Sequence, residues 1–226
     1  MKNIAIIPAR GGSKRLPNKN ILLLGGIPLI AHSILEAQKN SAIIDEVYVS
    51  TDALQIKEIA LAYGAKVIDR PAQLSGDLEP TVTSLKHVLE SIEMGVDAVF
   101  LLQPTNPLRP ANLIAAAFQK FNENQADSLM TVTRSHQKFG KISNDTFVPF
   151  NYTMGQRSQD LEPLYFENGL LYIIQSQLIL EEKLIGNKLL PMLVDHPFAN
   201  VDIDTQEDFD YAVYLHQKNL KSEIQQ

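Results

Sequence analysis

Residues 8–20 combine glycines with basic side chains, a combination suited to binding phosphate. The segment holds four cations and no carboxylate, and its Gly11-Gly12 pair follows the apolar run 4–7. Glycine here lets the backbone approach a ligand closely, at a cost in backbone entropy. The first 35 residues carry a formal charge of +5 in a chain whose net charge is −6. This concentration favours a small, highly charged anion over a nucleic acid, which binds a broad basic face; a merely solvated basic loop is the alternative.

A second group of reactive side chains is the pair Asp202-x-Asp204, which opens a stretch with five acidic residues between positions 202 and 210. Two positions apart at a strand end, both carboxylates point to one side. This suits Mg²⁺, which proteins hold with few carboxylates and with substrate phosphates. Alternatively, Asp204 only caps the following helix. A phosphate cradle and a hard-cation site are the two parts that phosphoryl and nucleotidyl transfer require.

Other catalytic signatures are missing from the sequence. It has no G-x-G-x-x-G, no Walker loop, no G-x-S-x-G and no H-E-x-x-H. The five histidines lack ligand spacing, and the chain has no cysteine, which excludes disulfides and thiolate metal sites. We therefore expect the chemistry to come from the cations and carboxylates described above.

Length and composition predict one substantial core. With 226 residues, of which 45% are hydrophobic, residues 1–226 are expected to form a single domain. We find no convincing signal peptide, and no apolar run approaches the ~20 residues of a membrane helix. We expect a cytoplasmic protein without nucleic-acid or membrane partners.

The elements that must position these residues alternate between strands and helices. Apolar runs predict strands at 2–7, 47–51, 66–68, 98–102 and 169–174. Amphipathic stretches predict a first helix that begins at Pro28 and a second that is capped by Asp52 and runs through Tyr63. Three further helices are predicted over 81–94, 110–122 and 205–217. This alternation predicts an α/β fold with a mostly parallel sheet and helices on both faces. Ligands of such sheets bind beyond the carboxyl ends of the strands, so the Arg10 loop, Asp52, Arg70 and Gln103 should converge on one crevice.

Residues 134–165 interrupt this alternation. They hold short strand-like pieces, turn residues and no strong helical period. We interpret the segment as an inserted β-rich arm rather than a new domain. Beyond it, residues 201–204 lead into the last helix, with Thr205 or Asp204 as its N-cap.

Ordered motifs along the whole chain resemble those of the acylneuraminate cytidylyltransferase family, which includes CMP-sialic acid synthetases and their CMP-legionaminate and CMP-pseudaminate relatives. The motifs are Ile7-Pro8-Ala9-Arg10-Gly11-Gly12-Ser13-Lys14 with Lys19-Asn20, Ser50-Thr51-Asp52, Arg70-Pro71, Leu101-Leu102-Gln103-Pro104-Thr105-Asn106-Pro107-Leu108-Arg109, Arg157-Ser158-Gln159-Asp160-Leu161, Asn168-Gly169 and Asp202-Ile203-Asp204-Thr205. The resemblance implies a nucleotide-diphospho-sugar-transferase-like fold.

The resemblance also implies a reaction. The anomeric hydroxyl of a nine-carbon 2-keto sugar acid would attack the α-phosphate of CTP, releasing pyrophosphate and giving a CMP-sugar. It implies that Asp202 and Asp204 bind Mg²⁺ and that one of them accepts the hydroxyl proton, so that these two act with Arg10 and Lys19 as catalytic residues. The residues implied to bind CTP are Ala9, Arg10, Gly11, Ser13, Lys14, Lys19, Asn20, Arg70 and Thr81.

By the same resemblance, the sugar acid would contact Gln103, Lys141, Arg157 and Asn168. Two of these residues, Lys141 and Arg157, lie in the 134–165 arm, which in the family resembles a dimerisation element that completes the neighbour's sugar site. Their charge suits the carboxylate of a keto acid, and arginine offers bidentate geometry. We therefore expect a homodimer.

One comparison narrows the substrate. The related 3-deoxy-manno-octulosonate (KDO) enzymes have Gln-Gly-Asp where this chain reads Gln103-Pro104-Thr105, which favours the sialic-type branch. Residues 135–140 and Glu167 differ from the sialic acid enzymes near the expected sugar end, and which nonulosonic acid is used stays open. The alternatives are a nucleotidyltransferase for KDO or a sugar 1-phosphate, and a catalytically inactive nucleotide-binding regulatory subunit.

Overall fold

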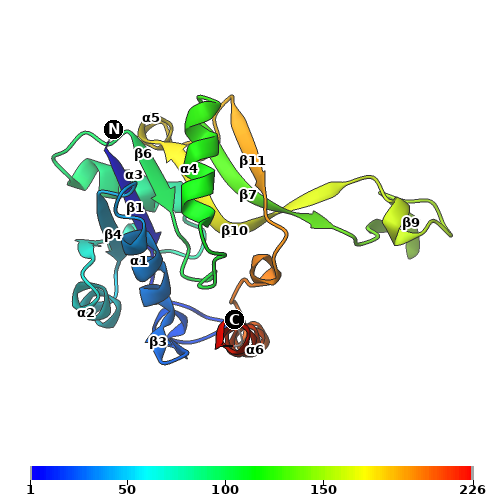
Figure 1. The fold of residues 1–226 in the computed structure, drawn as a ribbon, viewed down its shortest axis with the longest axis horizontal. Helices are drawn as coiled ribbons and strands as arrows, with labels where there is room; N and C mark the ends of the chain where they lie inside the picture. The colour runs from blue at the N-terminus through cyan, green and yellow to red at the C-terminus, as the bar shows by residue number, and fades with distance from the viewer. Residues whose placement is uncertain (1, 225–226) are drawn as a thin grey trace.

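The computed structural model describes residues 2–224 and is built around a seven-stranded sheet (Figure 1). The strands follow the order β11-β7-β10-β6-β1-β4-β5. Their bounds are β1 Asn3–Pro8, β4 Glu46–Thr51, β5 Lys66–Asp69, β6 Ala98–Leu101, β7 Ser128–Ser135, β10 Leu164–Gln175 and β11 Leu189–Leu193.

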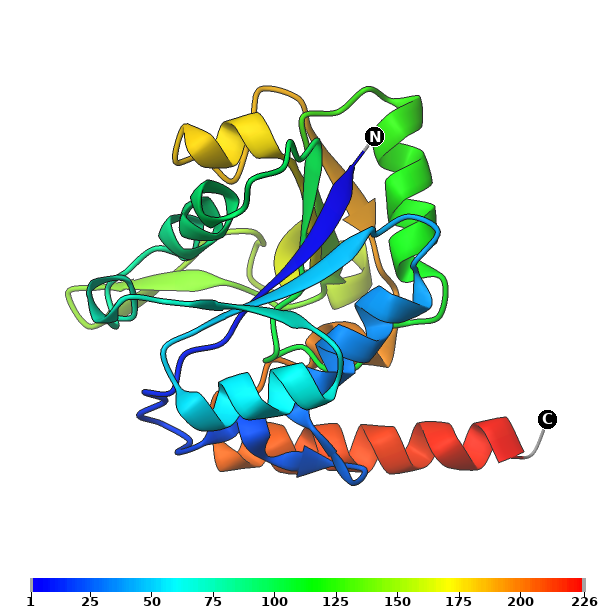
Figure 2. The ribbon, with the colours of Figure 1, turned by 90° about the vertical axis from the view of Figure 1, so that its left-hand side faces the viewer.

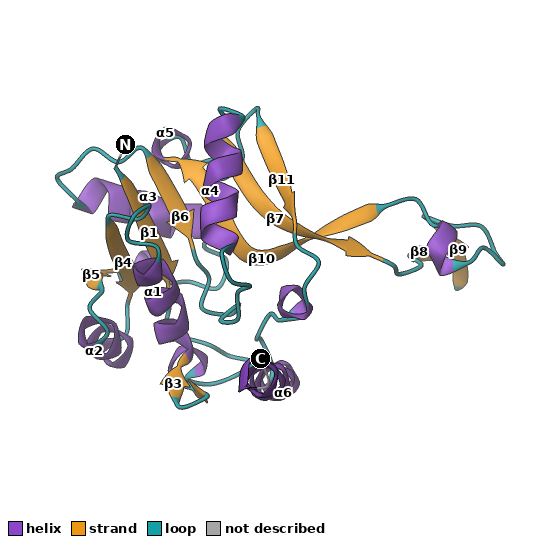
Figure 3. Cartoon of the chain, in the orientation of Figure 1, coloured by secondary structure: helices purple, strands orange, loops and turns teal. Residues whose placement is uncertain are grey.

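Most neighbouring strands of this sheet are parallel (Figure 3). Strand β10 alone runs antiparallel to both of its neighbours, β6 and β7. Because of this reversal, the amino-terminal half of β10 lies beyond the carboxyl end of β6, where Tyr172 pairs with Leu101. The predicted mostly parallel sheet is confirmed.

Helices cover both faces of the sheet, as predicted, and Figure 2 shows the strands between them. The helices on one face are α1 Leu29–Lys39, α2 Leu54–Ala62 and α4 Leu113–Glu123. On the other face lie α3 Thr81–Ser91 and α5 Ser176–Leu180. The central strands are buried on both sides: Ile4 and Ile6 face α3, whereas Ala5 and Ile7 face α1. This explains why β1 reads as a continuous apolar run.

A third cluster holds the last helix, α6 Gln206–Ile224, below the carboxyl ends of the strands (Figure 2). Its apolar residues pack on the short hairpin β2 Leu23–Leu24 and β3 Ile27–Pro28 and on Leu16. Since Leu16 belongs to the basic loop, this packing brings that loop against the last helix. None of the helices within residues 2–224 has the length and apolar character that crossing a membrane requires.

The segment between β7 and β10 extends away from the sheet (Figure 1). It contains a separate hairpin, β8 Gly140–Ser143 with β9 Thr146–Pro149. Several of its large apolar side chains are exposed, among them Ile142, Phe147 and Phe150. The role of this arm in dimerisation stays a prediction.

Several predicted boundaries were wrong. The helix expected over 81–94 ends at Ser91, because Ile92 is extended, and the helix expected from Pro110 begins at Leu113, after Asn112 adopts a left-handed φ of 60°. Asp52 does not cap α2: Ala53 occupies the N-cap, and the Asp52 carboxylate accepts a hydrogen bond from the Gly11 amide instead.

The end of the chain also differs in part from expectation. Residues 201–204 lie outside the sheet rather than at a strand end. Thr205 is the capping residue of α6, since its hydroxyl accepts from the Asp208 amide and its own amide donates to the Asp208 carboxylate. The short elements α5 and β11 were not predicted at all.

Candidate active site

A cavity of about 470 Å³ lies at the carboxyl ends of the parallel strands. Its volume falls in the range of small-molecule sites. Residues from the basic loop, from the ends of β5 and β6, from the start of α3 and from the segment before α6 line it. The predicted site residues among them are Arg10, Ser13, Lys14, Lys19, Asn20, Arg70, Thr81, Gln103 and Asp204. The predicted convergence on one crevice is thus seen for these residues, whereas Asp52 supports the loop from behind.

The basic loop is held open by hydrogen bonds to its backbone. The side chain of Asn20, which is nearly buried, donates to the Arg10 carbonyl over 3.0 Å, and the Gly11 amide donates to Asp52 over 2.9 Å. Gly11 also packs so closely on Ala53 that an added Cβ would lie 2.8 Å from the Ala53 Cβ. A side chain at position 11 would therefore displace the loop, which accounts for the glycine.

Two of the loop cations are paired with Asp77, which lies between β5 and α3. Arg10 Nη1 lies 2.7 Å from Asp77 Oδ1, and Lys14 pairs with the other carboxylate oxygen. Hydrogen bonds from Lys14 and then Arg10 lower the pKa of Asp77. The Asp77 carboxylate is thus bound to two cations that would suit phosphate oxygens.

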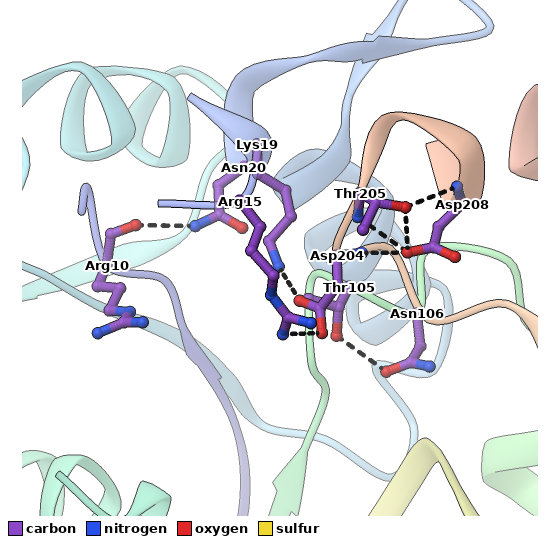
Figure 4. A network of polar contacts seen from close by, with 9 residues as sticks. All are labelled: Arg10, Arg15, Lys19, Asn20, Thr105, Asn106, Asp204, Thr205 and Asp208. Carbon is purple, nitrogen blue, oxygen red and sulfur yellow. Dashed lines mark hydrogen bonds and ion pairs between the residues drawn. The ribbon is translucent and has the colours of Figure 1, made fainter. Parts of the chain in front are cut away.

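Two further cations of the loop meet Asp204 (Figure 4). Arg15 Nη2 lies 2.5 Å from Asp204 Oδ2, and Lys19 Nζ lies 2.7 Å from Asp204 Oδ1. The Asp204 amide donates to Asp208 over 3.0 Å, so the start of α6 fixes its backbone. Asp204 is therefore joined directly to the cationic loop and lines the cavity with it, whereas Asp202 does not line the cavity.

Asp202 differs from Asp204 in its surroundings. Its pKa is raised, first by desolvation and further by the nearby Asp204 charge, although a hydrogen bond from Thr105 opposes the shift. Val201 and Ile203 are buried while Asp202 and Asp204 are not, so the two carboxylates project on the same side. Oxygen donors of this kind suit a hard divalent cation. In residues 2–224 no cluster of three or more His, Cys, Asp or Glu could hold a metal ion, so this pair would need substrate oxygens to complete a coordination shell.

Arg70 and Thr81 form the far wall of the cavity, where Thr81 begins α3. Arg70 Nη2 donates to the Ser50 carbonyl over 2.7 Å, which ties β5 to the end of β4. Burial lowers the pKa of Arg70, and the Asp52 carboxylate counters this. The Arg70 Nε is buried without a hydrogen-bond partner among the described residues, so it has donor capacity left for a ligand.

Gln103 lines the cavity beyond β6, and two residues of its motif that were not predicted as site residues support it. Arg109 is buried and donates to the Leu170 carbonyl over 2.7 Å and to the Gln103 carbonyl over 3.0 Å. Burial lowers the pKa of Arg109 to about 10, so it stays charged at neutral pH. Asn106 is buried as well and is bonded on two sides. The clue in the sequence was their place in the motif that contains Gln103.

The other predicted site residues, Asp202 and Gly11 included, do not line this cavity. The Asn168 side chain is buried and bonded within the protein, accepting from Thr131 over 2.5 Å and donating to Thr133 over 3.0 Å. Arg157 forms a bidentate pair with Asp160, and Lys141 lies over the Phe150 ring, both on the projecting arm. Ala9 is buried at the end of β1, and its amide donates to Ser50. The expected sugar contacts of Asn168, Lys141 and Arg157 stay predictions.

Comparison with known proteins adds the family context. Residues 4–225 match a family profile described as cytidylyltransferase. The chain is 36% identical to a pseudaminic acid cytidylyltransferase of Campylobacter jejuni, over 98% of this chain and 99% of the relative. It is 34% identical to a CMP-N,N'-diacetyllegionaminic acid synthase of Legionella pneumophila, again over 98% and 99% of the two chains. A solved structure of CMP:2-keto-3-deoxy-manno-octonic acid synthetase complexed with CTP superposes with a TM-score of 0.70, over 97% of this chain and 100% of that chain, at 20% identity, which is a likeness of fold.

Proposed function

Because the chain belongs to the cytidylyltransferase family, we propose that it joins CTP to a nonulosonic 2-keto sugar acid and releases pyrophosphate. It is a nucleotidyltransferase, and the resemblance noted in its motifs is confirmed. The observation that carries the substrate class is the similarity over nearly full length to two relatives named for pseudaminic and legionaminic acids. The product would be a CMP-sugar.

The cationic loop supports a role for this cavity in binding the triphosphate. Arg10, Lys14 and Lys19 would neutralise the negative charge that grows on the leaving pyrophosphate as the bond from the α-phosphorus to the bridging oxygen breaks. Ser13 would add a hydrogen bond to the triphosphate. Ala9 and Gly11, whose amides donate to Ser50 and Asp52, would contact it through the rest of their backbone, while Asn20 holds the Arg10 backbone in place. Arg70 and Thr81, on the opposite wall, would contact the nucleoside.

The acidic pair would act on the α-phosphate by holding a metal ion. Cytidylyltransferases of this kind typically use a divalent metal ion, and we propose Mg²⁺ held by Asp202 and Asp204. Bound there, it would neutralise phosphate charge and orient the nucleotide. Since Asp204 pairs with Arg15 and Lys19, nucleotide phosphates would draw these cations away and make both Asp204 oxygens available. Binding of CTP would then strengthen the binding of the metal ion, and binding of the metal ion would strengthen that of CTP.

The sugar end would lie beside Gln103, near the start of β10. We propose that the 134–165 arm mediates a homodimer and that its Lys141 and Arg157 bind the sugar carboxylate of the neighbouring protomer. The exposed apolar residues of the arm support this, because such patches on a monomer commonly mark interaction sites. Mixing Arg157→Ala protein with an Asp202→Asn protein tests it. Recovered activity in the mixture is expected if sites are shared between protomers, and strictly additive residual activity would contradict it.

The central experiment measures pyrophosphate release from CTP with several nonulosonic acids, with KDO and with sugar 1-phosphates. We expect turnover with at least one nonulosonic acid. Turnover only with KDO or with a sugar 1-phosphate would refute the proposed acceptor class while leaving the nucleotidyltransferase assignment intact. Omitting divalent metal, and replacing CTP by UTP, ATP or GTP, provide the matched controls.

A further inference from the structure

Asn106 lies almost fully buried between two segments that are distant in sequence. Its side chain is 1% exposed. The amide Nδ2 donates to the Val201 carbonyl over 2.7 Å and to the Asn168 carbonyl over 3.1 Å, and Oδ1 accepts from the Thr105 hydroxyl over 3.1 Å. The Asn106 side chain thus joins its own turn to the backbone at Val201 and at Asn168, while its oxygen bonds the neighbouring Thr105 hydroxyl (Figure 4 shows the Thr105 contact).

The first of these segments carries the acidic pair. Val201 directly precedes Asp202, and the next buried residue, Ile203, donates its amide to the Thr105 carbonyl over 2.9 Å. The segment is therefore attached to the Thr105-Asn106 turn through the backbone of two alternate residues, Val201 and Ile203, which flank Asp202. Of these two attachments, the Val201 bond is the one that a side chain, Asn106, provides.

The second segment borders the sugar end. Gly169 follows Asn168 in the irregular part of β10, where the pairing with β7 is interrupted between Glu167 and Tyr172, and has a φ of 73°. A Cβ at Gly169 would lie 2.8 Å from Asn106 Oδ1 and 2.9 Å from Gln103 Oε1. Asn106 therefore lies in contact with the backbone next to the cavity residue Gln103.

From these contacts we infer that Asn106 is a positioning residue: it aligns the Asp202-Asp204 segment with the Gln103 end of the cavity. The inference rests on the proposed function for the role of the two carboxylates as metal ligands. Outer residues that orient ligands commonly change metal affinity by 10- to 100-fold when they are replaced. A residue that served only core stability would alter stability without changing the metal requirement.

The test uses Asn106→Leu, which keeps the branched shape but removes the hydrogen bonds, and Asn106→Asp, an isosteric second variant in case the first folds poorly. The matched control is Asn3→Leu. Asn3 is also buried, at 3% exposed, and its side chain donates to the Ile43 carbonyl over 3.0 Å. It lies at the amino-terminal end of β1, whereas the cavity lies at the carboxyl ends of the strands. Amide hydrogen exchange of the peptide spanning 200–206 is measured in metal-free protein, and the Mg²⁺ concentration for half-maximal pyrophosphate release is measured in parallel.

We expect exchange at 200–206 to be at least about tenfold faster in the Asn106 variants and unchanged in the control. The half-maximal Mg²⁺ concentration should rise about tenfold or more. Unchanged exchange at 200–206 overturns the inference, and so does faster exchange with an unaltered Mg²⁺ requirement. If the wild-type protein turned over no acceptor, the proposed function would fail, whereas hydrogen exchange would still decide whether Asn106 positions the segment.

Discussion

Lys19 Nζ and Asp204 Oδ1 lie 2.7 Å apart, although 185 residues separate them in the chain. The Lys19 side chain is only 12% exposed, so water screens this pair less than an ordinary surface ion pair. The contact joins the cationic loop to Asp204 and partly neutralises the charge of both groups. Phosphate oxygens would compete with Asp204 for Lys19, and a divalent metal would compete with Lys19 for Asp204.

Replacing Asp202 by asparagine separates the metal role from folding. Desolvation raises the pKa of Asp202, so removing its charge should leave the free energy of unfolding unchanged or slightly higher. Turnover should fall by about a hundredfold or more, and the Mg²⁺ requirement should rise, because one of the two proposed ligands is lost. Kinetics over a range of Mg²⁺ concentrations and urea unfolding measure the two effects. Asp210→Asn, on α6, is the control, and an unaltered Mg²⁺ dependence of Asp202→Asn would refute the assignment.

Replacing Asp77 by asparagine should tighten the binding of CTP. The Asp77 carboxylate pairs with Arg10 and Lys14, so CTP must displace it before its phosphates reach these cations. We expect the Kd for CTP, measured by calorimetry, to fall by about three- to tenfold, an effect that shrinks at high salt. Glu79→Gln changes a second carboxylate of the cavity and should have a smaller effect. Weaker binding in Asp77→Asn would indicate instead that Asp77 contacts the nucleotide or its metal.

Asp208 makes the stability of α6 dependent on pH. Desolvation would raise the pKa of Asp208, but hydrogen bonds from the Asp204 and Thr205 amides outweigh it and the pKa is lowered. A carboxyl whose pKa is depressed on folding stabilises the protein fully above its ordinary pKa of 3.8, and this contribution is lost as the pH falls through the folded-state value. Asp208→Ala should cost ~1 kcal/mol near neutral pH, with the difference from wild type disappearing below that value.

Urea unfolding at about pH 7 and at the lowest pH at which the wild type folds tests this dependence. Asp210→Ala is the matched control, since the hydrogen bond that Asp210 accepts from Gln206 is exposed. A difference between Asp208→Ala and wild type that persisted unchanged in acid would show that the charge of Asp208 is not responsible.

Gly169→Ala tests the crowding around Gln103 and Asn106. The φ of 73° at Gly169 and of 88° at Gly155 penalise any Cβ by ~1 kcal/mol. At Gly155 nothing lies within 4 Å of an added Cβ, whereas at Gly169 two side-chain oxygens lie within 3.0 Å. Gly169→Ala should therefore lose a further ~1–3 kcal/mol of stability and raise the KM for the sugar acid. Equal losses in the two variants, by unfolding and by kinetics, would contradict the proposed contact.

The sequence alone was enough to predict the class of fold, and it singled out two groups of candidate site residues. Apolar runs such as residues 4–7 and the helical spacing in 29–35 are local patterns, and they identified the parallel strands and their helices. The cations of residues 8–20 and the Asp202-x-Asp204 pair were recognisable because their residue types are unusual for their places in the chain. The missed elements had weak local patterns: α5 has five residues, and the half-exposed β11 contains Pro191 at the edge of the sheet.

Only the tertiary structure decided which groups meet. The pairs Arg10–Asp77, Lys19–Asp204 and Asn106–Val201 depend on the order of strands in the sheet and on the packing of α6 below it, which no local pattern specifies. The same holds for Asp52, whose carboxylate was expected at a helix cap but binds the Gly11 amide. A side chain bonds to whichever partner the fold brings within reach, so residue type and spacing predicted the chemistry of the site, and the fold determined its geometry.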